Sequence, residues 1–255
     1  HHRLYEFAKT ALIKIFAFPY ATVCDLYCGD TDKWDDAQIG HYIGVDREML
    51  ESQRKPYTTE FCKLDPSVEN LESHLHDKDI VCCLQHLQSC FESEEKARSL
   101  LRNVSSLLKP GGYFFGITPD SSTIWAKYQK NVEASHNKNI VPSCIRSENY
   151  MITFEVEEEK FPSFGKIYQL KFANDHCLVH FPSLIRLARD AGLEYVEIQN
   201  LAEFYDDNRS QFASMLNFVD PRGRLLARSF DLLGLYSIFV FQKPDPDAAP
   251  PIMTP

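Results

Sequence analysis

The feature that most constrains the fold of this chain is a regular alternation of short β-rich runs and helical stretches between Thr22 and Thr118. Such alternation is typical of βαβ units, in which helices connect parallel strands and cover the sheet. The runs predict strands at 22–28, 41–46, 59–65, 79–84 and 113–118. We therefore expect an α/β fold built on a doubly wound, mostly parallel sheet.

Three segments between these strands are expected to be helical, at 47–55, 68–76 and 93–108. The last is strongly amphipathic, because its apolar residues recur at helical spacing. Lys-Pro-Gly-Gly at 109–112 should end this helix and turn the chain into the next strand, since glycine tolerates a left-handed C-cap and proline cannot continue a helix.

The remainder of the chain is expected to add a helix, a β-rich insertion and two further strands, which makes seven strands in the sheet. In order, the ranges are helix 122–134, insertion 150–172, helix 181–191, strand 194–199, a helix with a loop at 203–217, and strand 235–241. With 255 residues, 44% of them hydrophobic, we expect one domain over 1–243 that carries an inserted region, 145–180. The tail 244–255 has five prolines and should be extended and mobile.

Charge and cysteine usage limit the function. A net charge of -9 argues against a broad grip on long nucleic acid, although a local basic patch can still hold a short RNA end. The eight cysteines show no zinc-type spacing, so we expect free thiols, a reducing compartment and no metal. Apolar runs fall short of the roughly 20 residues that a membrane span needs, so a soluble protein is expected.

The segment 23–30, Val-Cys-Asp-Leu-Tyr-Cys-Gly-Asp, covers the first predicted strand and the turn after it, where Rossmann-like folds bind nucleotides. It is similar to the Asp-Leu-Gly-Cys-Gly loop of methyltransferases that use S-adenosylmethionine. Tyr27 stands at the first glycine, and the loop that follows is short. Glycine matters here because the backbone must approach the cofactor without an intervening Cβ.

More specific matches follow in order along the chain. They are Leu-Lys-Pro-Gly-Gly at 108–112, Gly-Ile-Thr-Pro-Asp-Ser at 116–121, Phe-Pro-Ser-Phe-Gly-Lys-Ile-Tyr at 161–168 and Leu-Val-His-Phe-Pro-Ser-Leu at 178–184. With these segments the chain resembles the mRNA cap guanine-N7 methyltransferases. The resemblance implies a Rossmann-like, seven-stranded class I methyltransferase fold, S-adenosylmethionine as cofactor with S-adenosylhomocysteine as product, capped RNA as substrate and a location in the nucleus.

Three charged residues are candidates for cofactor binding. Asp46 ends the second strand and can accept both ribose hydroxyls, although an Asp that caps the next helix is the alternative. Asp65 is the matching candidate for the adenine amino group, or else a turn residue before Pro66. Lys9 aligns with a family lysine on the cofactor carboxylate, against the alternative of a solvated helix lysine. The resemblance adds Tyr27, Gly29, Leu84 and Gln85.

The resemblance also indicates residues on the cap side. Tyr5 and Glu6 stand where the family has two cap-binding asparagines, and His176 stands where it has the Glu that reads guanine. Tyr236 matches a cap-contacting Tyr, with an aromatic residue of a core strand as the alternative. The remaining candidates are Ser89 and Phe164 for the cap, and Lys9, Lys33, Lys127 and Arg146 for its phosphates.

No nucleophile or general base is expected, because guanine N7 has a lone pair and no proton to remove. Proximity, orientation and the field of the site then provide the catalysis. The expected activity is methyl transfer to N7 of the cap guanine of a 5′ RNA end, by a protein that is expected to be monomeric. A diverged, non-catalytic homologue that binds cofactor or RNA ends is an alternative suggested by Tyr27 and the altered cap positions. A methyltransferase for another small substrate is the third possibility.

Overall fold

The computed structural model describes residues 2–29, 31–48, 54–71, 75–136, 143–154, 164, 167–170, 175–212, 222, 224 and 226–248. Its centre is a sheet of seven strands: β1 Thr22–Leu26, β2 His41–Asp46, β3 Thr58–Lys63, β4 Lys78–Cys83, β5 Leu108–Pro119, β10 Glu194–Asn200 and β11 Tyr236–Gln242. The order across the sheet is β10-β11-β5-β4-β1-β2-β3, and β11 runs antiparallel to both of its neighbours. The predicted α/β class and the predicted number of strands are confirmed.

The order of the strands indicates which edge of the sheet would bind a ligand. The chain leaves β1 toward β2 and β3 on one side, and returns to β4 and β5 on the other. In open α/β sheets this reversal opens a crevice outside the carboxyl ends of the two central strands, here β1 and β4. The loops after Leu26 and Cys83 are therefore the first place to look for a site.

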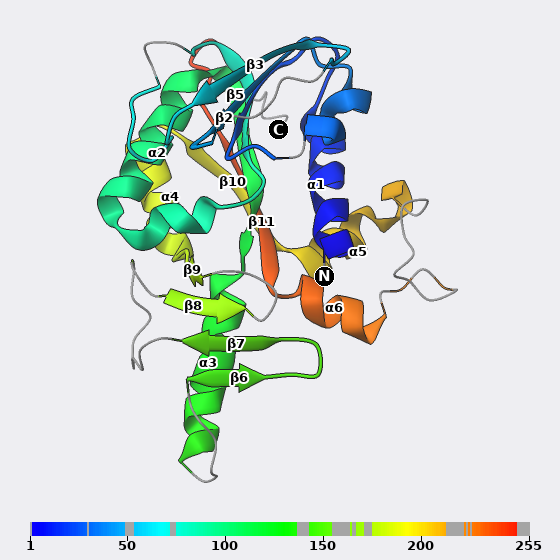
Figure 1. Ribbon diagram of the computed structural model, residues 1–255, viewed down its shortest axis with the longest axis vertical. Coiled ribbons are helices and arrows are strands. Elements are labelled where there is room, and N and C mark those ends of the chain that lie inside the picture. The colour runs from blue at the N-terminus through cyan, green and yellow to red at the C-terminus, as the bar shows by residue number, and fades with distance from the viewer. Residues whose placement is uncertain are drawn as a thin grey trace, which may run out of the picture.

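Helices cover both faces of the sheet (Figure 1). The helices are α1 His2–Phe16, α2 Glu94–Leu107, α4 Phe181–Asp190, α5 Leu201–Phe212 and α6 Ala227–Leu233, with 3-10 helices η1 Thr31–Ala37 and η2 Leu87–Glu92. A further helix, α3 Ser121–Ser135, extends away from the sheet at the bottom of Figure 1. One apolar core lies on the side of α1, α5 and α6, and a second lies on the side of α2 and α4. Because both faces are buried, the central strands consist of nearly continuous buried residues, as in β1 and β4.

The helix α2 begins where the sequence predicts. The Ser93 side chain caps it by accepting from the Lys96 amide at 3.3 Å. Its end is Leu107, and the chain enters β5 at Leu108; the pairing of β5 with β4 is interrupted between Leu108 and Tyr113, where Gly111 has the left-handed φ of +83° that the sequence predicts for a glycine turn. The Gly111 amide donates to the Lys243 carbonyl at 2.7 Å, which continues the pairing with the end of β11.

Two predicted helices are only partly described, because residues 49–53 and 72–74 lie outside the described residues. Within 47–55, residues 47–48 form a bend and 54–55 are irregular, since Pro56 disfavours helix in the residue before it. Within 68–76, the described residues form a turn at the start and irregular chain elsewhere. Here the Asn103 side chain of α2 hydrogen-bonds the backbone: it accepts from the Leu71 amide at 3.1 Å and donates to the Pro66 and Glu69 carbonyls at 2.8 and 2.7 Å.

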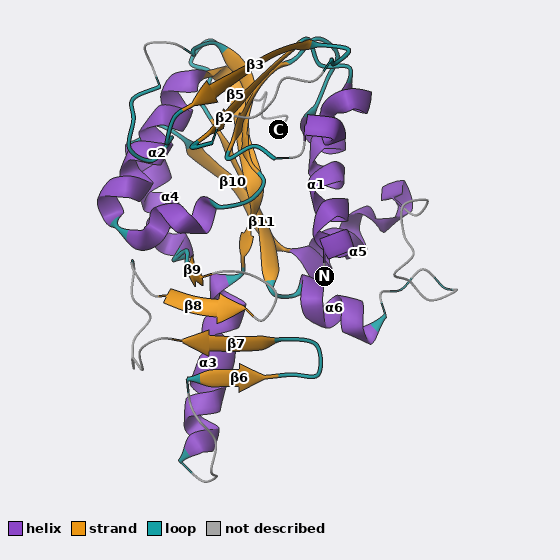
Figure 2. Cartoon of the chain, in the orientation of Figure 1, coloured by secondary structure: helices purple, strands orange, loops and turns teal. Residues whose placement is uncertain are grey.

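The β-rich insertion forms a separate antiparallel sheet, in the order β6-β7-β8-β9 (Figure 2). Its strands are β6 Cys144–Arg146, β7 Met151–Phe154, β8 Ile167–Leu170 and β9 Asp175–Cys177. It lies beyond the carboxyl edge of the central sheet, where β6 contacts α3 and β9 contacts η2. The insertion therefore adds a second layer of chain at the edge where a site is expected.

Other expectations concern the tail, the thiols and the membrane. The tail turns at Asp245, whose carbonyl accepts from the Ala248 amide at 3.2 Å, and residues 249–255 lie outside the described residues. Seven of the eight cysteines are seen as free thiols, and the Cys177 side chain is outside the described residues. Among the described residues, no helix is long and apolar enough to cross a membrane. No group of potential metal ligands is found in the same part of the chain.

Candidate functional site

Lys9 lies at the carboxyl edge of the sheet and is almost fully buried, with 2% of its surface exposed. Its ammonium donates to Gln85 Oε1 at 3.1 Å and to Glu6 Oε1 at 3.3 Å. Gln85 follows β4, so this contact ties α1 to the central crevice. A buried charge requires such partners, and the alternative of a solvated helix lysine is wrong.

Gly29 lies next to the same glutamine. A Cβ built on Gly29 would come within 3.0 Å of Gln85 Nε2, tighter than an ordinary contact. A side chain at this position would push the Gln85 amide by a few tenths of an ångström, and Gln85 is the partner of Lys9. The small space suits glycine, the residue that the sequence pattern predicts for a cofactor loop.

Two tyrosines connect α1 to the start of β11. The Tyr5 hydroxyl donates to the Leu84 carbonyl at 2.8 Å, and its ring meets Tyr236 edge-on with centroids 5.1 Å apart. Tyr236 is 7% exposed, and burial raises the pKa of its phenol. The core aromatic alternative for Tyr236 fits this burial, and the contact with Tyr5 places the same ring beside the candidate site.

Glu6 bridges two cations at this edge. Its Oε1 accepts from Lys9, and its Oε2 forms an ion pair with Lys33 of η1. Lys33 is therefore held by a carboxylate from α1. Of the other phosphate candidates, Lys127 lies over the Tyr150 ring at 5.6 Å and Arg146 is exposed on β6.

Tyr27 and Asp65 form a second cluster, beside β1 and after β3. Tyr27 is buried, and its hydroxyl lies 3.2 Å from Asp65 Oδ1 and 3.3 Å from Cys90 Sγ. Asp65 Oδ1 also accepts from the Ser67 amide at 3.0 Å, which is the turn contact expected from the alternative reading of this residue. Its Oδ2 pairs with Arg47 Nε at 3.0 Å.

Asp46 ends β2 as predicted. Its Oδ1 accepts from the Glu48 amide at 3.1 Å, and no other hydrogen bond of this carboxylate is seen among the described residues. This contact is also the one that a helix cap would make, and residues 49–53, where the helix of the alternative interpretation would continue, lie outside the described residues. One carboxylate oxygen is thus available for a ligand.

The remaining cap candidates lie apart from the Lys9 cluster. Ser89 on η2 donates to the His86 carbonyl at 2.7 Å, and Phe164 stacks on Phe91 with centroids 5.7 Å apart. Phe164 packs against the α2 and α4 core, whereas Tyr236 belongs to the α1 core. His176 is on β9, and its side chain is outside the described residues.

Sequence reasoning gave no role to two buried carboxylates. Asp25 Oδ2 accepts from the Tyr42 hydroxyl at 2.6 Å, and Cys82 Sγ lies 3.3 Å from Oδ1. Burial, and then the charge of Asp25, raise the pKa values of Tyr42 and Cys82, so both partners keep their protons. The signal that could have identified Asp25 is a polar residue inside an apolar strand sequence.

Asp120 is the second buried carboxylate to which sequence reasoning gave no role. It caps α3 by accepting from the Thr123 amide at 2.9 Å. Its Oδ2 accepts from Asn200 at 2.9 Å and from Ser237 at 2.7 Å. The carboxylate thereby joins β5, β10 and β11 directly beside Tyr236.

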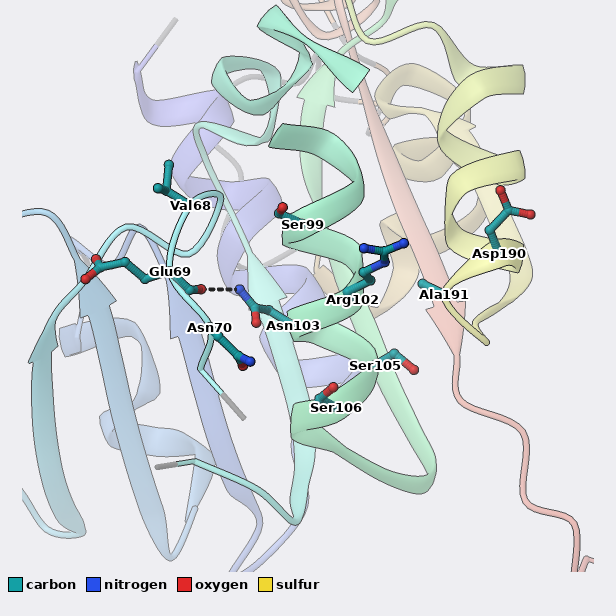
Figure 3. A pocket seen from close by; sticks show the side chains of 10 residues that line it. All are labelled: Val68, Glu69, Asn70, Ser99, Arg102, Asn103, Ser105, Ser106, Asp190 and Ala191. Atoms are coloured by element: carbon teal, nitrogen blue, oxygen red, sulfur yellow. Dashed lines mark hydrogen bonds between the residues drawn. The ribbon is translucent and has the colours of Figure 1, made fainter. Parts of the chain in front are cut away.

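A hollow of about 410 Å³ lies elsewhere, on the outer face of α2 (Figure 3). Its walls are the turn at 68–70, polar side chains of α2 such as Ser99 and Arg102, and the end of α4 at Asp190. None of the candidate cofactor or cap residues lines it. The hollow is therefore separate from the carboxyl-edge clusters.

Solved structures with a similar fold are methyltransferases. A putative S-adenosylmethionine dependent methyltransferase from Listeria monocytogenes aligns with a TM-score of 0.55 at 11% identity, over 96% of this chain and 99% of that one. An S-adenosylmethionine dependent methyltransferase from Mesorhizobium loti aligns with a TM-score of 0.54 at 13% identity, over 93% and 97%. At such identities the likeness establishes the fold alone.

Sequence relatives are far closer. An mRNA cap guanine-N(7) methyltransferase 2 of Oryza sativa subsp. japonica is 71% identical over all of this chain and 84% of its own length. The Arabidopsis thaliana protein of the same name is 66% identical over all of this chain and 80% of its own length. The rice alignment extends over 283 positions, so that relative has additional residues within the matched region. The model of the mRNA (guanine-N(7))-methyltransferase domain matches residues 2–243. The chain therefore belongs to the mRNA (guanine-N(7))-methyltransferase family.

Proposed function

We propose that this protein transfers a methyl group from S-adenosylmethionine to N7 of the guanine in the 5′ cap of RNA. The observation that carries the proposal is the match of the cap methyltransferase domain to residues 2–243, with 71% identity to a relative of that name. The Lys9, Gln85 and Gly29 cluster at the switch point of the sheet gives the proposal a location.

The side chains at this edge fit the cofactor. Lys9 offers an ammonium for its carboxylate, and the bare backbone at Gly29 permits close approach. Asp46 has an acceptor oxygen for the ribose hydroxyls, and Asp65 has one for the adenine amino group. Tyr27, Leu84 and Gln85 complete the proposed cofactor set. When bound, S-adenosylmethionine supplies a methyl group on a positively charged sulfur.

On the cap side, we assign Tyr5, Glu6 and Tyr236 to one wall of the guanine site, because they adjoin Lys9. Ser89, Phe164 and His176 are proposed for the opposite wall, toward η2 and the insertion. These residues would orient the base and exclude water. No proton has to move, because N7 attacks through a lone pair, so no catalytic acid or base is assigned.

The described residues do not favour the non-catalytic alternative. Tyr27 has φ +54°, in the left-handed region that glycine usually occupies. The backbone after β1 therefore keeps a conformation suited to a glycine loop in spite of the substitution. The third possibility, another small substrate, has no support beyond the fold.

The direct test is methyl transfer from labelled cofactor to GpppRNA. We expect label at guanine N7, and none on uncapped RNA or on RNA that already carries N7-methylguanine. A known cap methyltransferase in parallel controls for the quality of the RNA. If the protein bound cofactor and left GpppRNA unlabelled while the control enzyme labelled it, the non-catalytic reading would replace this proposal.

We also propose that the protein acts in the nucleus, where transcripts receive their caps. Support comes from the family, whose substrate is the capped end of mRNA. Imaging of the tagged protein in plant cells tests this, and a signal confined to the cytoplasm would contradict it.

A further inference from the structure

The residue after β1 is unusual in both identity and conformation. Tyr27 adopts φ +54°, which is unfavourable for a residue with a Cβ, and glycine would adopt it without strain. Its side chain is 5% exposed and packs in the core on the α2 side. A strained conformation of this kind persists where surrounding contacts hold it, and functional sites are where such residues gather.

The hydrogen bonds of the phenol have a fixed direction. Tyr27 has a single hydroxyl proton, and an ionised carboxylate can only accept. Burial alone would raise the pKa of Asp65, but hydrogen bonds from Ser67, the charge of Arg47 and the hydrogen bond from Tyr27 lower it. The hydroxyl therefore donates to Asp65 Oδ1 at 3.2 Å, and the Cys90 thiol, 3.3 Å away, donates to the phenol oxygen. Burial raises the pKa of Tyr27, and it raises that of Cys90 to about 11, so both keep their protons at neutral pH.

The two oxygens of the Asp65 carboxylate have different partners. Oδ1 lies within hydrogen-bond distance of three donors, which fully occupy its two lone pairs: the Tyr27 hydroxyl, the Ser67 amide and the Ser67 hydroxyl at 2.7 Å. Oδ2 meets only Arg47 Nε among the described residues, at 3.0 Å, and the side chain retains 23% exposure. Since each carboxylate oxygen has two lone pairs, Oδ2 can accept one further donor from a ligand.

We propose that Tyr27 is a positioning residue for adenine recognition: its hydroxyl fixes Asp65 so that Oδ2 faces the exocyclic amino group of the cofactor. This inference rests on the proposed function, in which Asp65 reads adenine. The tyrosine then does more than replace a glycine, because its ring fills core space and its hydroxyl sets the rotation of a carboxylate that follows a different strand. The strained φ is maintained by these contacts.

The test compares two ligands on the full chain by calorimetry. S-adenosylhomocysteine carries the amino group, and S-inosylhomocysteine carries a carbonyl oxygen in its place, which would face the carboxylate. The wild type should prefer the adenosyl compound by at least about tenfold, because the inosyl compound leaves an acceptor facing an acceptor. Tyr27→Phe, which removes only the hydroxyl, should lower this preference at least about threefold, because Asp65 is then free to rotate. Tyr27→Gly should lose it to a similar extent, and it serves as a second variant if the Phe protein does not fold.

Two further variants separate the possible failures. Asp65→Asn should abolish the preference. If it does so while both Tyr27 variants keep the wild-type ratio, the positioning role is overturned and the proposed function stands. If Asp65→Asn keeps the preference, the adenine assignment of Asp65 fails, and the role of Tyr27 fails with it. Tyr57→Phe is the matched control, since it removes a phenol hydroxyl that donates to Asp35 Oδ1 at 3.0 Å near the opposite edge of the sheet. It should leave the ratio unchanged, and an equal loss in this variant would show that removal of any such hydroxyl is sufficient, which also overturns the proposal.

Discussion

Lys9, Glu6 and Lys33 at the carboxyl edge are held by protein partners. Lys9 is nearly as buried as the core leucines, and it is tolerated because Gln85 and Glu6 accept from its ammonium. Removing an ion from water costs free energy unless such contacts replace hydration. The same contacts fix the ammonium in one place before a ligand arrives. The site is thus organised in advance, which lowers the entropy lost on binding.

Asp46 offers a clean test at the residue scale. Asp46→Ala should weaken S-adenosylhomocysteine binding by about 1.5–3 kcal/mol, roughly 10- to 150-fold in Kd, because a carboxylate that accepts two ribose hydroxyls is lost. Calorimetry on the purified protein measures this. Asp36→Ala removes an exposed carboxylate of η1 and is the matched control, for which Kd should stay unchanged. Equal affinities in the Asp46 variant and the wild type would remove Asp46 from the cofactor site.

The position of a candidate site residue could be predicted from the sequence where its own segment of the chain determines that position. Asp46 ends a strand and Gly29 lies in a turn, and both properties depend on neighbours in the chain. Glu6 with Lys33, and Tyr27 with Asp65, could not be paired in this way. Tyr27 and Asp65 are 38 residues apart and meet only because β1, β2 and β3 lie side by side. Their contact therefore depends on the order of the strands in the sheet.

Among the elements, one asparagine side chain of α2 hydrogen-bonds the backbone of a turn. Asn103 of α2 satisfies three backbone groups of residues 66–71, so this segment remains a turn with few internal hydrogen bonds. The dashed contact to the Glu69 carbonyl in Figure 3 is one of them. Asp65 immediately precedes this segment, and its position therefore depends indirectly on α2.

Loss of that side chain should be costly. Asn103→Ala leaves buried backbone groups without partners, and we expect the free energy of unfolding to fall by about 2–4 kcal/mol. Denaturant unfolding followed by circular dichroism measures this. Arg102→Ala, at the neighbouring exposed position of α2, should change stability by less than about 0.5 kcal/mol. A loss below about 1 kcal/mol in the Asn103 variant would mean that the segment finds other hydrogen bonds.

Elements with strong periodicity could be predicted from the sequence, and those that depend on distant partners could not. The seven strands and α2 follow from apolar runs and from a regular apolar face. In the described residues of 68–76, the backbone forms a turn whose Leu71 amide donates to Asn103, more than 25 residues away. The start of β5 at Leu108 depends on pairing with Lys78 of β4, which is distant in the chain. The turn residues at 109–112 alone predict that the strand starts later, at 113.

For the molecule as a whole, the net charge of -9 disfavours extended contact with RNA. At the described carboxyl edge, cations such as Lys9 and Lys33 are matched by Glu6, so the local positive charge is small and confined. A phosphate chain that left this region would meet a protein with more acidic than basic residues. Recognition should therefore depend on the cap and its nearest phosphates.

This leads to a prediction about RNA length and salt. A capped RNA of about five nucleotides should bind within about threefold of a capped RNA ten times longer, because a net charge of -9 disfavours contact with the additional phosphates. For the same reason, the slope of log K against log salt concentration should lie between about -1 and -3, the value for a few phosphate contacts on a single strand. Fluorescence anisotropy at several salt concentrations measures both quantities, with an uncapped RNA of the longer length as control. Tighter binding of the long RNA with a much steeper slope would reveal an extended RNA path and would contradict recognition confined to the capped end.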